Sequence, residues 1–139
     1  MTTRGQRYPV AGSRNARVEL WVVELANAKR SQIDLVDEEE FYLARVDWLP
    51  DSRTLAYQRL PRRQQSLDLV FAPADGSNPR TVLREESDVW INLHDDLHFL
   101  KDTKRFLWTS ERSGYRQIYL YSTGGKELAA CQQIGRAHV

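Results

Sequence analysis

The stretch Val46–Tyr57, VDWLPDSRTLAY, decides the fold: it reads as a strand, a polar turn and a second strand, and it occurs twice. An imperfect copy, LHFLKDTKRFLW, follows at Leu97–Trp108. A third strand, LDLVF at Leu67–Phe71, is matched in the same way with QIYLY at Gln117–Tyr121. Repeats of roughly fifty residues built from short strands are typical of β-propeller blades, which are four-stranded antiparallel sheets.

Alternation of apolar and polar residues extends this pattern along the chain, and no segment has helical periodicity. We expect strands at residues 18–25, 31–36, 41–49, 55–60, 67–72, 81–83, 94–100, 105–110, 117–121 and 127–133. Aromatic residues recur at matching places in the two copies, and we expect them to pack between adjacent sheets: Trp48, Tyr57, Phe99, Trp108, Tyr119 and Tyr121.

The fold class predicted is therefore all-β: a partial β-propeller of about two four-stranded antiparallel blades and the remnant of a third. The propeller fragment spans residues 6–133, with a partial blade at 6–36 and blades at 41–90 and 91–133. Two blades and a remnant cannot close a ring, so further blades are expected in a longer protein.

The two ends of the chain do not follow the repeat. Residues 1–5 precede it, and residues 134–139, IGRAHV, match the translation of a common sequencing-adapter read. We therefore expect the last six residues to be an artefact and the reading frame to continue differently.

Composition narrows the classes of partner. The 139 residues carry a net charge of +1, which gives no electrostatic reason to expect nucleic acid. No apolar run approaches the roughly 20 residues of a membrane span. The single cysteine, Cys131, excludes an internal disulfide, leaves the compartment open, and is expected to be a buried or half-buried inert thiol in an outer strand.

Four ordered motifs resemble the dipeptidyl peptidase IV family. The segment Arg7–Val18 is similar to a Tyr-Pro-x-Ala-Gly pattern followed by Asn and a Val-led strand. The later motifs resemble successive blades of the same family: Trp48–Asp51, Glu86–Trp90 and Trp108–Tyr119. Any one motif is weak, but the ordered set covers nearly the whole chain.

The resemblance implies an N-terminal eight-bladed propeller joined to a C-terminal α/β-hydrolase domain. It implies a serine exopeptidase that releases Xaa-Pro or Xaa-Ala dipeptides, with a peptide as partner and a homodimer in many members. The catalytic serine of such enzymes sits in a Gly-x-Ser-x-Gly elbow, which this sequence lacks, so no catalytic residue and no cofactor is assigned. The Glu-Glu pair that binds the substrate amine in the family lies upstream of Tyr8-Pro9, outside the sequence.

Substrate contact is assigned to Asn92 and Leu93. In the family that this chain resembles, the residues after Trp90 face the central cavity. They line the outer side of the subsite for the residue before the scissile proline. The alternative for this segment is an ordinary link between blades.

Other polar clusters are better explained structurally. Glu38–Glu40 follows Tyr8-Pro9 instead of preceding it, so a solvated charge run is favoured over an amine site. His94–His98 contains imidazoles and carboxylates, but a polar cluster at a blade edge is favoured over a metal site. Ser110–Arg112 sits on a hairpin with no base for the serine, and ion pairing of Glu111 or Arg112 with a neighbouring turn is expected.

Two other functions stay open from the residues alone. A non-catalytic propeller that binds proteins would show the same repeat. A relative of the acylaminoacyl or prolyl oligopeptidases would also show it, but would not explain the Tyr-Pro-x-Ala-Gly pattern at Tyr8–Gly12.

Overall fold

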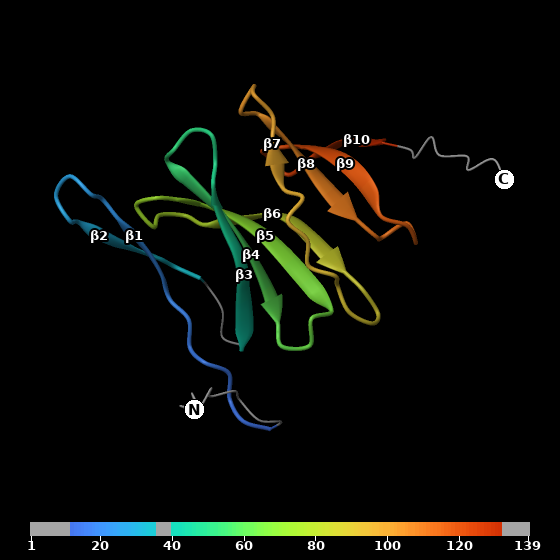
Figure 1. Ribbon diagram of the computed structural model, residues 1–139, viewed down its shortest axis with the longest axis horizontal. Helices are drawn as coiled ribbons and strands as arrows, with labels where there is room; N and C mark the ends of the chain where they lie inside the picture. The colour runs from blue at the N-terminus through green and yellow to red at the C-terminus, as the bar shows by residue number, and fades with distance from the viewer. Residues whose placement is uncertain (1–11, 36–39, 132–139) are drawn as a thin grey trace, which may run out of the picture.

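The computed structural model describes residues 12–35 and 40–131, and within them every regular element is a β-strand. The strands form three antiparallel sheets that follow one another in chain order (Figure 1). The two-stranded sheet consists of β1 (Leu20–Val23) and β2 (Arg30–Ile33). None of the residues described forms a helix with the length and apolar character needed to cross a bilayer.

Both larger sheets have four strands each, and the first lies between the other two sheets (Figure 1). The first four-stranded sheet contains β3 (Phe41–Trp48), β4 (Thr54–Pro61), β5 (Ser66–Pro73) and β6 (Arg80–Glu86). The second four-stranded sheet contains β7 (His98–Phe99), β8 (Arg105–Ser110), β9 (Gln117–Ser122) and β10 (Glu127–Cys131). The strand order is sequential in each, as expected of propeller blades.

The repeated turn has the same chemistry in both copies. In the first, Asp51 Oδ1 accepts hydrogen bonds from the backbone amides of Arg53 at 2.8 Å and Thr54 at 2.9 Å. In the second, Asp102 Oδ1 accepts bonds from the two corresponding amides at 3.0 and 3.2 Å. An aspartate that satisfies turn amides in this way fixes the start of the next strand. The recurring Asp is therefore a structural part of the repeat.

The register of the third strand differs from the sequence match. Tyr57 pairs with Val70 in the first four-stranded sheet, and its counterpart Trp108 pairs with Tyr119 in the second. Val70 therefore corresponds to Tyr119 in the repeat. The sequence match of Leu67–Phe71 with Gln117–Tyr121 instead aligned Val70 with Leu120. The match was wrong by one residue, which matters because a one-residue shift turns every side chain to the other face of a sheet.

Two apolar clusters hold the sheets together. One joins the two-stranded sheet to the first four-stranded sheet, through residues such as Ile33, Tyr57 and Val70. The other fills the space between the two four-stranded sheets, and its buried members are Leu49, Ala56, Leu60, Leu67, Leu69, Phe71, Val82, Leu83, Phe106, Trp108, Tyr119 and Tyr121. The first four-stranded sheet is thus covered on both faces.

Glycines in the two outer turns allow each sheet to lie directly on the preceding one. Gly76, with φ +86°, ends its turn so close to β2 that an added Cβ would lie 2.2 Å from the Gln32 carbonyl oxygen. Gly125, with φ +90°, meets the carbonyl oxygen of Val82 in the same way at 2.3 Å. Only glycine fits both the backbone conformation and the close approach.

Three sequence expectations are corrected. The strand predicted at residues 94–100 is reduced to β7, because the residues before it bond to side chains of β8 and the β8–β9 turn. Trp48 is 51 % exposed, because it ends β3, an edge strand whose last four residues are all exposed. Cys131 is exposed, since β10 forms the outer edge of its sheet.

Candidate functional site

Three connections meet at one edge of the two four-stranded sheets. Successive antiparallel strands alternate in direction, so the β4–β5 turn, the segment after β6 and the β8–β9 turn share that edge. We call the segment from residue 87 to residue 97 the link, because it joins β6 to β7. The predicted substrate residues, Asn92 and Leu93, both lie on the link and are exposed.

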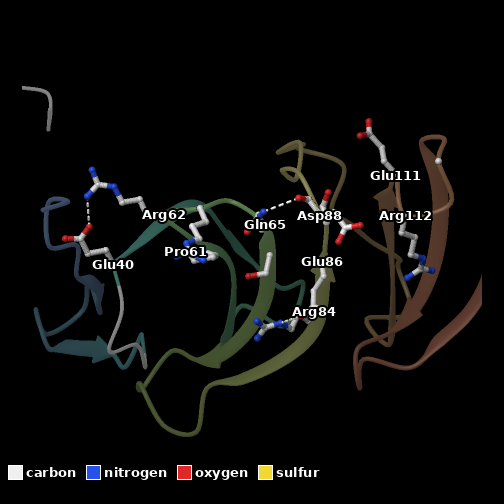
Figure 2. A pocket seen from close by; sticks show the side chains of 13 residues that line it. Glu40, Pro61, Arg62, Gln65, Arg84, Glu86, Asp88, Glu111 and Arg112 are labelled. Atoms are coloured by element: carbon white, nitrogen blue, oxygen red, sulfur yellow. Dashed lines mark hydrogen bonds and ion pairs between the residues drawn. The ribbon is translucent and has the colours of Figure 1, made fainter. Parts of the chain in front are cut away.

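Backbone hydrogen bonds tie the link to the β4–β5 turn. The amide of Ser87 donates to the Gln65 carbonyl at 2.8 Å, and the amide of Ile91 donates to the Gln64 carbonyl at 2.8 Å. The side-chain amide of Gln65 also donates to the Asp88 carbonyl at 3.1 Å (Figure 2). The first half of the link is therefore held in place by the first four-stranded sheet.

The second half of the link is anchored on Trp108, which is fully buried. The indole Nε1 of Trp108 donates to Glu85 Oε1 at 2.9 Å, and the His94 ring packs edge-on against the indole with centroids 4.4 Å apart. Burial lowers the pKa of His94 and keeps the imidazole neutral. The Asp96 amide donates to His94 Nδ1 at 3.3 Å, so Nδ1 is the unprotonated nitrogen.

The acidic residues of the link pair with arginines. Asp95 forms an ion pair with Arg45 of β3, and this contact lowers the pKa of Asp95. Asp96 Oδ2 accepts hydrogen bonds from Thr109 Oγ1 at 2.8 Å and from Arg116 at 2.5 Å. Over residues 12–35 and 40–131, no group of three or more His, Cys, Asp or Glu side chains could hold a metal ion.

A hollow of about 310 Å³ opens between the link and the β8–β9 turn. Trp90, Asn92 and Glu111 line it, and Leu93 is not among its lining residues although 43 % of it is exposed. Trp90 Nε1 donates to Asn92 Oδ1 at 3.2 Å, and Asn92 Nδ2 donates to Glu111 Oε2 at 2.8 Å. The structure thus brings one of the two predicted residues into a concave site and leaves the other on its outer surface.

Arg112 fixes the β8–β9 turn beside this hollow. Its guanidinium lies 3.7 Å from the Tyr119 ring centroid and donates to Tyr121 Oη at 2.6 Å and to Glu127 Oε2 at 2.6 Å. The sequence predicts an ion pair of Glu111 or Arg112 with a neighbouring turn. Arg112 does form an ion pair, but its partner Glu127 is the first residue of strand β10. Ser110 is buried and accepts a bond from the Arg112 amide at 3.2 Å, which is a structural role.

A wider groove of about 1290 Å³ runs along the same edge and is lined by charged side chains of both signs (Figure 2). At one end Arg62 pairs with Glu40 at 2.7 Å, and this hydrogen bond lowers the pKa of Glu40. Glu40 is therefore held by an arginine, and Glu38 and Glu39 lie outside the described residues. The groove and the hollow share five lining residues: Glu86, Ser87, Glu111, Arg112 and Gly114.

Sequence reasoning missed the pairing of Asn92 with Glu111. The two residues are 19 positions apart and belong to different connections, so no local motif joins them. The available signal was topological: in an antiparallel sheet, the connection before the first strand and the turn after the second strand lie at the same edge. Together, Trp90, Asn92 and Glu111 place an aromatic ring, an amide and a carboxylate in one concave surface. Ligand-binding sites typically combine such groups.

The sequence has clear relatives. Residues 1–137 match the family described as the dipeptidyl peptidase IV (DPP IV) N-terminal region. Dipeptidyl peptidase 8 of Mus musculus is 27 % identical over 159 residues, which cover 87 % of this chain and 18 % of that protein. Dipeptidyl peptidase 4 of Trichophyton equinum is 26 % identical over 131 residues, and the match covers 88 % of this chain and 17 % of that protein. This chain therefore spans less than a fifth of the length of these relatives.

Solved structures show the same fold. A putative dipeptidyl aminopeptidase IV from Bacteroides ovatus has a TM-score of 0.79 at 25 % identity, covering 86 % of this chain and 17 % of that one. Porphyromonas gingivalis dipeptidyl peptidase 4 has a TM-score of 0.83 at 22 % identity, covering 91 % and 18 %. The three sheets correspond to a partial propeller, and the chain belongs to the dipeptidyl peptidase IV N-terminal region family.

Proposed function

We propose that this chain is a section of the propeller domain of a dipeptidyl peptidase IV-like serine exopeptidase, where it positions the peptide substrate. In this proposal the longer parent protein supplies the α/β-hydrolase domain and its catalytic serine. The peptide end that carries an Xaa-Pro or Xaa-Ala dipeptide lies against the link, with Asn92 and Leu93 as contacts. Positioning of this kind contributes to the rate by fixing the scissile carbonyl in a reactive geometry.

The observation that carries the proposal is the concave site at the link. Asn92 lies in a hollow that is open to solvent, next to the exposed indole of Trp90. The link is held on both sides, by backbone hydrogen bonds to the β4–β5 turn and by the packing of His94 against the buried Trp108. A rigid, exposed loop segment with an amide and an aromatic ring is suited to gripping an extended peptide.

The test is made in the full-length parent enzyme with a chromogenic Xaa-Pro amide. Asn92→Ala removes a hydrogen-bonding side chain and is expected to lower kcat/KM about tenfold, whereas Leu93→Ala removes apolar contact and lowers it about threefold. The loss should appear in kcat as well as in KM, because these residues are proposed both to bind the peptide and to fix the position of its scissile carbonyl.

Asn27→Ala is the matched control, because Asn27 is an exposed asparagine in the β1–β2 turn. It should leave kcat/KM unchanged. If Asn92→Ala and Leu93→Ala also leave both kinetic constants unchanged, the link does not contact substrate. If the parent protein proves to have further blades and no peptidase activity, a protein-binding propeller becomes the correct function.

A further inference from the structure

The hollow combines an exposed aromatic ring with a carboxylate. Trp90 is 63 % exposed and Glu111 is exposed, and both line the same cavity. Asn92 bridges them, since its Oδ1 accepts from the indole at 3.2 Å and its Nδ2 donates to Glu111 Oε2 at 2.8 Å. The Trp90 ring and the Glu111 carboxylate are therefore both hydrogen-bonded to the same side-chain amide, that of Asn92.

The negative charge of Glu111 is left uncompensated by its cationic neighbours. Arg112 is bound to Glu127 at 2.6 Å and to Tyr121, and Arg116 is bound to Asp96 at 2.5 Å. Figure 2 shows the side chains of Glu111 and Arg112 leaving the strand end in opposite directions. Among the residues described, the group that donates a hydrogen bond to the Glu111 carboxylate is the neutral side-chain amide of Asn92.

A carboxylate and an exposed indole that line the same cavity form an arrangement that favours a positive charge. The carboxylate supplies an ion pair and the indole supplies a cation–π contact, and both gain strength when the site is partly shielded from water. A volume of about 310 Å³ is at the small end of ligand cavities, which suits one long side chain. Lysine and arginine have both the length and the charge.

We propose that this hollow binds the cationic side chain of a lysine or arginine at the amino-terminal position of the peptide substrate. The inference rests on the proposed function, which brings the peptide to Asn92. Glu111 is then a residue that determines substrate specificity, and Asn92 holds its carboxylate in place. Substrates with an uncharged amino-terminal side chain of similar length occupy the same hollow but form no ion pair with Glu111.

The experiment compares Lys-Pro and Met-Pro amides in the full-length parent enzyme. Glu111→Gln removes the charge and keeps an oxygen that can accept from Asn92. It is expected to lower the Lys-Pro to Met-Pro ratio of kcat/KM about fivefold. The ratio in the unsubstituted enzyme should fall as salt is added, because ions screen an exposed pair.

Glu86→Gln is the matched control. Glu86 lines the same hollow and is exposed, but its carboxylate already pairs with Arg84 at 3.1 Å. Its substitution should leave the Lys-Pro to Met-Pro ratio unchanged. Inhibition by the free dipeptides Lys-Pro and Met-Pro measures the same preference without turnover, and Glu111→Gln should weaken only Lys-Pro.

The two proposals fail in different ways. A Lys-Pro to Met-Pro ratio that is unchanged in Glu111→Gln, or changed equally in Glu86→Gln, overturns the cation site whatever Asn92→Ala does. Whether the link contacts the peptide at all is a separate question. It is decided by whether Asn92→Ala lowers kcat/KM for both the Lys-Pro and the Met-Pro substrate.

Discussion

The two four-stranded sheets share a repeat but differ in how they are buried. Tyr57 and Val70 project toward the preceding sheet and are buried, as are their counterparts Trp108 and Tyr119. The opposite faces are unlike each other. Leu69 of β5 is completely buried, whereas Ile118, which occupies the same place in β9, is 44 % exposed.

The difference shows that neighbours, more than the strand sequence itself, decide burial in this fold. The first four-stranded sheet has a sheet against each face, so β5 is buried at six consecutive positions. The second has its described neighbour on one face only, so β9 alternates between buried and more exposed positions. Repeat folds of this kind are stabilised mainly by contacts between adjacent units.

The largest expected effect comes from the position at which the two sheets differ most. Leu69→Ala should lower the free energy of unfolding by about 2–5 kcal/mol, because it opens a cavity in the shared core. Ile118→Ala, at the equivalent place, should cost less than about 1 kcal/mol, because much of its side chain is already in water. Urea unfolding of the chain, followed by far-ultraviolet circular dichroism, measures both values. If Leu69→Ala and Ile118→Ala lowered the free energy of unfolding equally, the two sheets would not differ in how the faces turned away from the preceding sheet are stabilised.

A smaller effect is expected where the two sheets agree. Gly76→Ala and Gly125→Ala should each cost about 2–3 kcal/mol, because the added methyl group meets backbone of the preceding sheet and the left-handed conformation disfavours alanine. Gly114→Ala is the control: its φ is +88°, but nothing lies within 4 Å of the added Cβ. It should cost only the conformational penalty of about 1 kcal/mol.

The same unfolding measurement decides the glycine prediction. If Gly76→Ala and Gly125→Ala cost no more than Gly114→Ala, the close contact between each turn and the preceding sheet does not contribute to stability. If only one of them is costly, the two sheets are not docked in the same way.

The smallest effect concerns the titratable group at the interface between the two four-stranded sheets. Burial lowers the pKa of His94 in the folded state, against the opposing effect of Asp96 and Glu85. The unfolded chain therefore takes up a proton first as the pH falls below about 6.5, and the folded state loses stability until its own lower pKa is passed. The loss should be smaller than the effects of the core and glycine substitutions, since the nearby carboxylates offset part of the effect of burial.

His94→Gln tests this by removing the titration while keeping a polar side chain. The variant should lack the decline in unfolding free energy that begins near pH 6.5. It should keep the decline at lower pH, which comes from carboxylates with a lowered pKa such as Asp51 and Asp102. An identical pH dependence in both proteins would show that His94 is not the group responsible.

Much of this fold is predictable from the sequence because its signals are local. The Asp turns, the alternating strands and the repeat each depend on residues that are close together in the chain, and the structure has these turns and strands in the expected order. The exposure of Trp48 and the shortened β7 were not predictable, because each depends on what lies across from the strand. The same holds for the pairing of Asn92 with Glu111, which joins two connections.

The sequence by itself determined the strands, their order and the two-fold repeat, since hydrophobic alternation and turn chemistry act over a few residues. Only the tertiary structure decided the register of β9, the faces that become buried and the hollow beside the link. These features depend on hairpin length and on which sheet packs on which. A one-residue difference in hairpin length shifts the register and turns a side chain to the other face of its sheet. Which register is stable depends on contacts with residues that are distant in the sequence.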